Sequence, residues 1–228
     1  MTEVMFSDGY YAYWWKYFEG IIAPSIGATL RMLSASMFLA LIFGFMLACM
    51  LILYGPQGLR PDNAKYKVLN FTVNSIRSFP VIILIVAISP ITRIIVGTSI
   101  GESAAIFPLT LAATPFMARI IENSLKSVDR QLIEAARSFG ASDFQIIMKV
   151  MVKESVPMIV AGTTLSTITF LSATTMAGAV GAGGIGAVAL NYGYQSFNNT
   201  VLYTSVLILF IMVLVIQRAG DWLYKRIY

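Results

Sequence analysis

Long apolar windows separated by short polar connections dominate the pattern of the chain. A helix needs about 20 mainly apolar residues to cross the roughly 30 Å hydrocarbon layer of a membrane. Five windows reach or approach this length, at about residues 32–54, 79–96, 104–121, 158–180 and 201–217. We therefore predict an all-α integral membrane protein with five transmembrane helices in one domain, residues 29–228.

Prolines interrupt the second and third windows, which are also short. Pro80 and Pro90 lie in the second, and Pro108 and Pro115 in the third. Membrane helices tolerate proline where neighbouring helices or water satisfy the freed carbonyl groups. These prolines predict kinked helices within a bundle.

The composition is typical of a protein in a lipid environment and argues against most kinds of catalytic site. Of the 228 residues, 57% are hydrophobic and 12% are charged, whereas soluble domains carry about 25% charged residues. The chain has no histidine, and Cys49 is its single cysteine. We therefore predict no intramolecular disulfide, no metal site and no catalytic site.

Basic residues are distributed unequally between the two ends of the predicted helices, and this asymmetry sets the orientation. With the N-terminus outside, only three of the sixteen lysines and arginines lie outside, namely Lys16, Arg31 and Arg93. The other thirteen lie inside: Arg60, Lys65, Lys67, Arg77, Arg119, Lys126, Arg130, Arg137, Lys149, Lys153, Arg218, Lys225 and Arg226. We predict the N-terminus outside and the C-terminus inside.

Residues 1–28 are rich in aromatic side chains, above all between Tyr10 and Phe18. Tryptophan and tyrosine gather where membrane meets water. We interpret residues 1–28 as an interfacial segment on the outer face, and an aromatic cage for a ligand is the alternative.

A long inner connection, residues 122–157, follows the third window. Within it Leu132, Ala135 or Ala136, and Phe139 recur at helical spacing. This spacing predicts a short helix with one apolar stripe.

A turn and a second helix follow. Gly140 stands where a left-handed residue ends a helix, and Ser142 with Gln145 predicts a capping box. The first helix could lie on the lipid surface or enter a groove of another protein. Two alanines beside Glu134 favour the groove, because small side chains permit close approach.

These residues resemble a known family. Glu134-Ala-Ala136, Gly140-Ala141 and Pro157 resemble the EAA loop of bacterial ABC importer permeases. Further stretches resemble the methionine-uptake (MetI-like) branch: Asn74-x-x-Arg77-Ser78-x-Pro80, Pro90-x-Thr92-Arg93, Val96 to Gly101, Met176 to Gly186, and Tyr192-Gly-Tyr194. The resemblance runs from residue 29 to the C-terminus, and Arg31 matches none of its motifs.

The resemblance implies a homodimer in a bacterial inner membrane. The dimer is expected to bind two cytoplasmic ABC ATPase subunits and to receive amino acid from an extracytoplasmic binding lipoprotein. ATP and Mg²⁺ would bind to the ATPase, because this chain contains no G-x-x-x-x-G-K-[ST] motif. The chain itself is expected to be a permease subunit that binds no cofactor and no nucleic acid, and not an enzyme.

In this resemblance the first helix of the inner connection is a coupling helix that enters the ATPase. Its contact residues are Leu132, Glu134, Ala135, Ala136, Phe139 and Gly140. Glu134 is expected to pair with an arginine of the ATPase, or within its own helix with Arg130 or Arg137. Gly140→Asp is expected to uncouple ATP hydrolysis from uptake, because the turn needs positive φ.

The fourth window carries the candidate pathway. Hydroxyl groups among glycines and alanines can join helices or line a wet route, and the candidates are Ser166, Thr169, Ser172 and Thr175. Met176 is a bulky, flexible side chain between small neighbours. We interpret Met176 as an outer gate at the dimer axis, with core filling as the alternative.

The string Gly181-Ala-Gly-Gly-Ile-Gly186 has the spelling of a dinucleotide-binding loop. Such a loop needs a preceding strand and an acidic residue roughly 20 positions later. Here a predicted membrane helix precedes the string, and no acidic residue lies between Glu154 and Asp221. We therefore predict a sharp outer turn with close packing.

Arg77 and Arg93 are predicted at the inner and outer ends of the second window. An arginine near a membrane is a functional candidate. We favour a place at the interface, or pairing of Arg93 with Glu102 and of Arg119 with Glu122. A role for Arg93 as a relay for the substrate carboxylate is the alternative.

The predicted function is the translocation pathway of an ATP-driven amino-acid importer, and the resemblance suggests L- or D-methionine. Cystine, histidine or another small amino acid is the alternative substrate. An ion-coupled secondary transporter would need more helices, an inverted repeat or charges at mid-membrane. A membrane enzyme would need a catalytic constellation, and the sequence shows none of these features.

Overall fold

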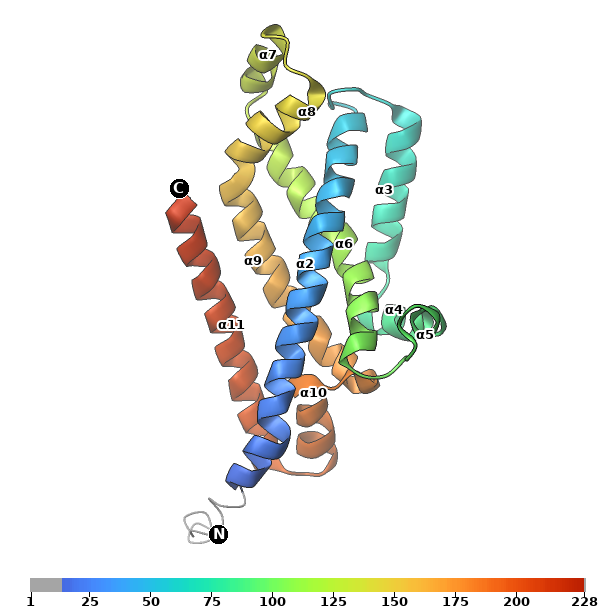
Figure 1. Ribbon diagram of the computed structural model, residues 1–228, viewed down its shortest axis with the longest axis vertical. Coiled ribbons are helices and arrows are strands. Elements are labelled where there is room, and N and C mark those ends of the chain that lie inside the picture. The colour runs from blue at the N-terminus through green and yellow to red at the C-terminus, as the bar shows by residue number, and fades with distance from the viewer. Residues whose placement is uncertain (1–13, 228) are drawn as a thin grey trace.

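The computed structural model describes residues 14–227, and every regular element in that range is a helix (Figure 1). Long helices run between the two ends of the molecule, and short helices lie at both ends. In chain order the elements are η2 (Phe18–Ile22), α2 (Ala23–Tyr54), α3 (Asn63–Ser78), α4 (Val81–Ala87), α5 (Ser89–Val96), α6 (Glu102–Lys126), α7 (Arg130–Ser138), α8 (Asp143–Gln145), η3 (Ile146–Met151), α9 (Val152–Ala177), η4 (Gly178–Ala182), α10 (Gly184–Ala187), η5 (Val188–Gln195) and α11 (Asn199–Ile227).

Four helices of the described range are long and apolar enough to span a membrane, or five when one bent pair counts as a span. Window 104–121 lies within α6, window 158–180 within the run Asp143–Ala182, and window 201–217 within α11. The helices continue beyond their apolar windows because polar residues extend them past the hydrocarbon layer.

The first helix starts earlier than window 32–54. Residues Trp14–Tyr54 form one run of 41 helical residues, and Tyr17 meets Tyr192 edge to face at 6.0 Å between ring centroids. The described part of the predicted interfacial segment therefore continues the membrane helix. The aromatic residues at positions 10, 11 and 13 lie outside the described range.

The second predicted window, residues 79–96, is not one transmembrane helix, and this prediction was wrong. The structure divides it into α4 and α5, and the candidate span of this region is the pair of α3 and α4, bent by 99°. Pro80 causes the bend, because it lacks an N–H donor and holds Phe79 in an extended conformation (φ −82°, ψ 133°). Hydropathy did not identify α3 as a membrane element, because Lys65 and Arg77 make this helix polar.

Asp62 begins α3. Its carboxylate accepts hydrogen bonds from the backbone N–H groups of Ala64 and Lys65, both at 3.1 Å. The bond from the Lys65 N–H is the main cause that lowers the pKa of this carboxyl group. The charged cap fixes where the chain turns back from α2.

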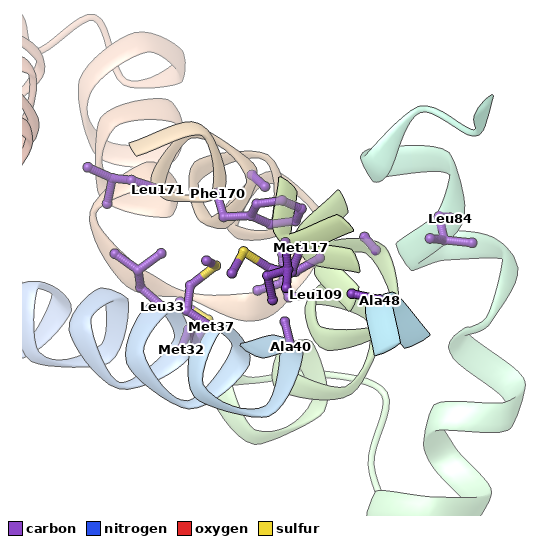
Figure 2. Packing of buried hydrophobic residues seen from close by; sticks show 14 of the residues in the cluster. Met32, Leu33, Met37, Ala40, Ala48, Leu84, Leu109, Met117, Phe170 and Leu171 are labelled. Carbon is purple, nitrogen blue, oxygen red and sulfur yellow. The ribbon is translucent and has the colours of Figure 1, made fainter. Parts of the chain in front are cut away.

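The main core lies between α2, α6 and α9. Figure 2 shows Met32 and Met37 of α2, Met117 of α6 and Phe170 of α9 in it. The backbones of α2 and α6 approach closely at Gly44, where an added Cβ would lie 2.7 Å from the Cβ of Met117. Small residues allow such contacts in lipid, where helices associate through packing.

The glycine string 181–186 forms the predicted sharp turn. Gly181, Gly183 and Gly184 have φ values of 94°, 82° and 78°, which glycine adopts without a steric penalty. They reverse the chain from η4 into α10, and Ile185 N–H donates to Thr29 Oγ1 at 2.9 Å, which ties the turn to α2. A helix precedes the string, so the context of a dinucleotide loop is absent.

Gly186→Ala is expected to destabilise the protein by about 1–3 kcal/mol, because the new methyl group has no room. A Cβ at this position would lie 2.6 Å from the backbone oxygen of Thr175, which cannot move without bending α9. Thermal unfolding in detergent measures the loss. Gly20→Ala is the control, since nothing lies within 4 Å of a Cβ there, and equal melting temperatures for the two variants would contradict the close packing.

Candidate functional site

A helical hairpin projects from one end of the bundle, where Figure 1 shows α7 and α8 at the top of the view. Asp129 caps α7 by accepting the N–H of Gln131 at 2.9 Å. Gly140 ends α7 with a φ of 79°, and Ser142 and Gln145 form a reciprocal capping box at α8. The predicted order of helix, glycine turn and capped helix is confirmed.

α7 has an inner and an outer side. Ile133 and Ala136 are partly buried against the core. Leu132, Ala135 and Phe139 face away, and Leu132 is 45% and Phe139 92% exposed. No part of residues 14–227 covers this apolar side. The structure thus places Ala135 on the exposed stripe and Ala136 on the packed side.

Glu134 lies on the surface of α7, with its carboxylate 3.5 Å from Nε of Arg130. The two side chains are 69% and 72% exposed, and an exposed pair contributes at most about 1 kcal/mol. The intrahelical pair, one of the two predicted alternatives, therefore forms in the single chain. It is weak enough for Glu134 to exchange it for another cation.

The base of the hairpin is fastened to the connection between α2 and α3. Arg137 donates to the carbonyl oxygen of Leu59 at 2.9 Å. Asp143 forms ion pairs with Arg137, at 3.9 Å, and with Arg60. A cavity of about 400 Å³ lies between this base and the adjacent ends of α2 and α6. The hairpin is therefore held to the α2–α3 connection at two points, Leu59 and Arg60, and the pair of Arg137 with Asp143 joins its own two helices.

A buried polar cluster lies below the hairpin and joins α3 to α6. Glu122 is fully buried and accepts hydrogen bonds from Arg119 at 2.6 Å and Lys126 at 2.7 Å. Arg119 also donates to Asn70 and, at 3.1 Å, to Asn74 of α3. The predicted pair of Arg119 with Glu122 is confirmed.

One face of α9 is exposed along its length and carries Thr169, Ser172 and Met176. Their spacing of three and four residues puts them on one side of the helix. Met176 is 46% exposed, and the Thr169 hydroxyl donates to Leu165 O within the helix at 2.9 Å. The structure brings these three predicted residues together, and their roles stay predictions.

Ser166 and Thr175 lie elsewhere on α9. Ser166 is fully buried, and its Oγ has no hydrogen-bond partner among the described residues. Thr175 lies against Gly186 of the returning helix α10, and its hydroxyl donates to Ser172 O at 2.7 Å. Both residues take part in helix packing and lie off the exposed face of Thr169.

Glu102 pairs with Arg31, and the predicted pair of Glu102 with Arg93 was wrong. Arg31 donates to both carboxylate oxygens of Glu102, at 2.9 and 3.2 Å. This pair joins α2 to α6 at the end opposite the hairpin. Arg93 lies exposed on α5, and no ion pair within residues 14–227 includes it. Sequence proximity favoured Arg93, whereas the fold brings together residues 71 positions apart.

Arg77 was predicted at the inner end of the second window, and this prediction was wrong, because α3 starts beside the hairpin and carries Arg77 at its far end. It lies at the end of α3, next to the bend at Pro80, and its guanidinium carbon is 5.5 Å from the centroid of the Phe116 ring. Asn70, Asn74 and Arg77 follow each other at spacings of four and three. This polar stripe on one side of a helix was the signal that could have identified α3 as a membrane element.

In the described range no group of three or more His, Cys, Asp and Glu side chains is arranged to hold a metal ion. The arrangement instead offers an uncovered apolar side on α7 and a partly polar exposed face on α9. The first suits contact with another protein, and the second suits passage of a small solute.

The chain is similar to known proteins over most of its length. A family model described as the binding-protein-dependent transport system inner membrane component matches residues 40–228. The probable D-methionine transport system permease protein MetI of Vibrio cholerae is 38% identical over 216 residues, which are 95% of this chain and 96% of the relative. The methionine import system permease protein MetP of Bacillus subtilis is 39% identical over 75% of this chain and 78% of the relative.

Two solved structures extend the comparison. A chain of the MetNI methionine ABC transporter, in an inward-facing conformation, matches with a TM-score of 0.90 and 40% identity over 92% of this chain and 97% of that chain. An amino acid ABC transporter solved with histidines matches with a TM-score of 0.73 at 17% identity, over 94% of this chain and 96% of that chain. The second likeness concerns the fold alone.

Proposed function

The chain belongs to the family of binding-protein-dependent transport system inner membrane components, and we propose that it forms the membrane pathway of an ATP-driven methionine importer. The observation that carries this proposal is the match to the MetNI methionine ABC transporter, at 40% identity over 92% of the chain.

The hairpin end faces the cytoplasm of a bacterial inner membrane in this proposal. The basic residues of α7, of the α2–α3 connection and of the end of α11 support this orientation. The turn formed by residues 181–186 then lies at the extracytoplasmic face.

A cytoplasmic ABC ATPase covers the outer side of α7 in this proposal. A short helix with Phe139 92% exposed needs a partner that takes this side chain out of water. The small Ala135 beside it lets a partner approach the backbone closely. Glu134 gives up its weak pair with Arg130 for a cation of the ATPase, which binds the ATP and Mg²⁺.

A second copy of the chain completes the pathway. Thr169 and Ser172 on α9, and Asn74 and Arg77 on α3, are exposed polar residues on membrane helices, and such residues face a protein interior or water rather than lipid. A two-fold dimer is the simplest closed arrangement that covers one face with a copy of itself. An extracytoplasmic binding lipoprotein supplies the amino acid and much of the selectivity.

The proposed function predicts ATP-dependent uptake of methionine by the chain reconstituted in liposomes with its ATPase and binding lipoprotein. Methionine should stimulate ATP hydrolysis more than cystine or histidine, and an ion gradient without ATP should drive no uptake. Preference for another amino acid would correct the substrate, whereas uptake driven by the ion gradient would overturn the class.

Gly140→Val is expected to lower the amount of methionine taken up per ATP hydrolysed. A Cβ on Gly140 meets nothing within 4 Å, so the substitution acts through backbone strain alone, about 1–2 kcal/mol for a left-handed L-residue. Gly140→Asn is the matched control, because asparagine tolerates this conformation, and Gly140→Asp should lie between the two. Normal coupling in the valine variant would reject the role of this turn.

Met176→Ala is expected to raise the leak of methionine through the resting transporter several-fold, because truncation removes the side chain that would close the outer gate at the dimer axis. Efflux from loaded liposomes without ATP measures the leak. Met158→Ala is the control, since Met158 lies on the same helix near its opposite end and is 51% exposed. An unchanged leak in the Met176 variant would favour the core-filling alternative.

A further inference from the structure

Arg77 holds a positive charge near the middle of the membrane. Its guanidinium group lies against the ring of Phe116, which is fourteen residues from the start of α6 and ten from its end. At 1.5 Å per residue these separations are about 21 and 15 Å, so the ring lies at mid-depth in a helix that spans the bilayer. The bend at Pro80 ends α3 at this depth.

The charge of Arg77 has no acidic partner in the part of the chain that the structure describes. Arg31 pairs with Glu102 and Arg119 with Glu122, whereas none of the ion pairs includes Arg77. The Arg77 side chain is exposed. A cation at mid-membrane is energetically costly unless it contacts water or an anion. Charged residues at this depth are therefore functional candidates.

Two features around Arg77 stabilise its positive charge at this place. The Phe116 ring lies near the guanidinium group and stabilises a cation from one side. Arg77 lies in the last turn of α3, where the partial negative charge of the helix carbonyl end also stabilises a cation. The forked donor groups of arginine match the geometry of a carboxylate.

The same ring connects Arg77 to the buried side of α9. Phe116 meets Phe170 edge to face at 5.9 Å between ring centroids, and Phe170 is the neighbour of Thr169 in sequence. Arg77 therefore lies one aromatic ring away from the helix that carries the candidate pathway, at the depth of its polar part.

We propose that Arg77 binds the α-carboxylate of the amino acid during its passage through the membrane. This inference rests on the proposed function and goes beyond it, because it assigns a substrate contact inside the permease. The binding lipoprotein delivers the amino acid, the guanidinium group of Arg77 pairs with its carboxylate at mid-depth, and the apolar rings of Phe116 and Phe170 lie beside this position.

Uptake by three variants tests the charge requirement. Arg77→Gln should reduce methionine uptake about tenfold or more, because a charge-assisted pair is lost. Arg77→Lys, which keeps the charge, should retain much more uptake than the glutamine variant. Lys67→Gln, on the same helix near its cytoplasmic end, is the matched control and should behave as wild type.

A thiol placed at position 77 separates a substrate contact from a structural role. In a Cys49→Ala background, Arg77→Cys should react with a water-soluble thiosulfonate, and methionine should slow the reaction. A reagent that adds an ammonium group should restore uptake, and an uncharged reagent of equal size should not.

Equal rescue by both reagents, no reaction with the water-soluble reagent, or full uptake by Arg77→Gln would overturn the inference. Each of these outcomes is scored in a preparation whose wild-type complex takes up methionine. Failure of the wild-type complex to do so would instead refute the proposed function.

Discussion

The carboxylate of Glu122 is the interaction on which the hairpin half of the molecule depends. It is fully buried between Arg119 and Lys126, and Arg119 extends the cluster to Asn70 and Asn74 of α3. Removing one member of a buried ion pair costs about 3–5 kcal/mol, because the remaining charge is left uncompensated. The Glu122 pair keeps Arg119 in place, and Arg119 joins the polar helix α3 to α6 through Asn70 and Asn74. These contacts fix the depth at which α3 ends.

Close backbone contacts fix the other half of the molecule, around the turn at residues 181–186. Lipid provides little hydrophobic drive for helix association, so shape and small residues decide the packing. Gly186 lets α10 lie against Thr175 of α9, and Gly184 lies where a Cβ would be 2.6 Å from Thr29 Oγ1. The turn at residues 181–186 is thereby locked to both α9 and α2, and the exposed face of α9 has a rigid end.

Local rules explain which features the sequence predicted well. The hairpin follows from residues a few positions apart, Gly140 and the pair Ser142 with Gln145, so their chemistry was visible without the fold. The bent pair was not visible, because hydropathy measures the length of an apolar run and α3 is polar. The partner of Glu102 was not visible either, since Arg31 and Glu102 meet only after α2 and α6 have packed.

A continuous series of contacts joins the hairpin to the end of α3. Arg137 and Asp143 bind the hairpin to Leu59 and Arg60, and α3 begins immediately after that connection, at Asn63. α3 in turn is tied to α6 by the Glu122 cluster and ends at Arg77 and Ser78. These contacts form one continuous series from α7 through the α2–α3 connection and α3 to the guanidinium group beside Phe116. The proposed coupling of α7 to the pathway would use this series.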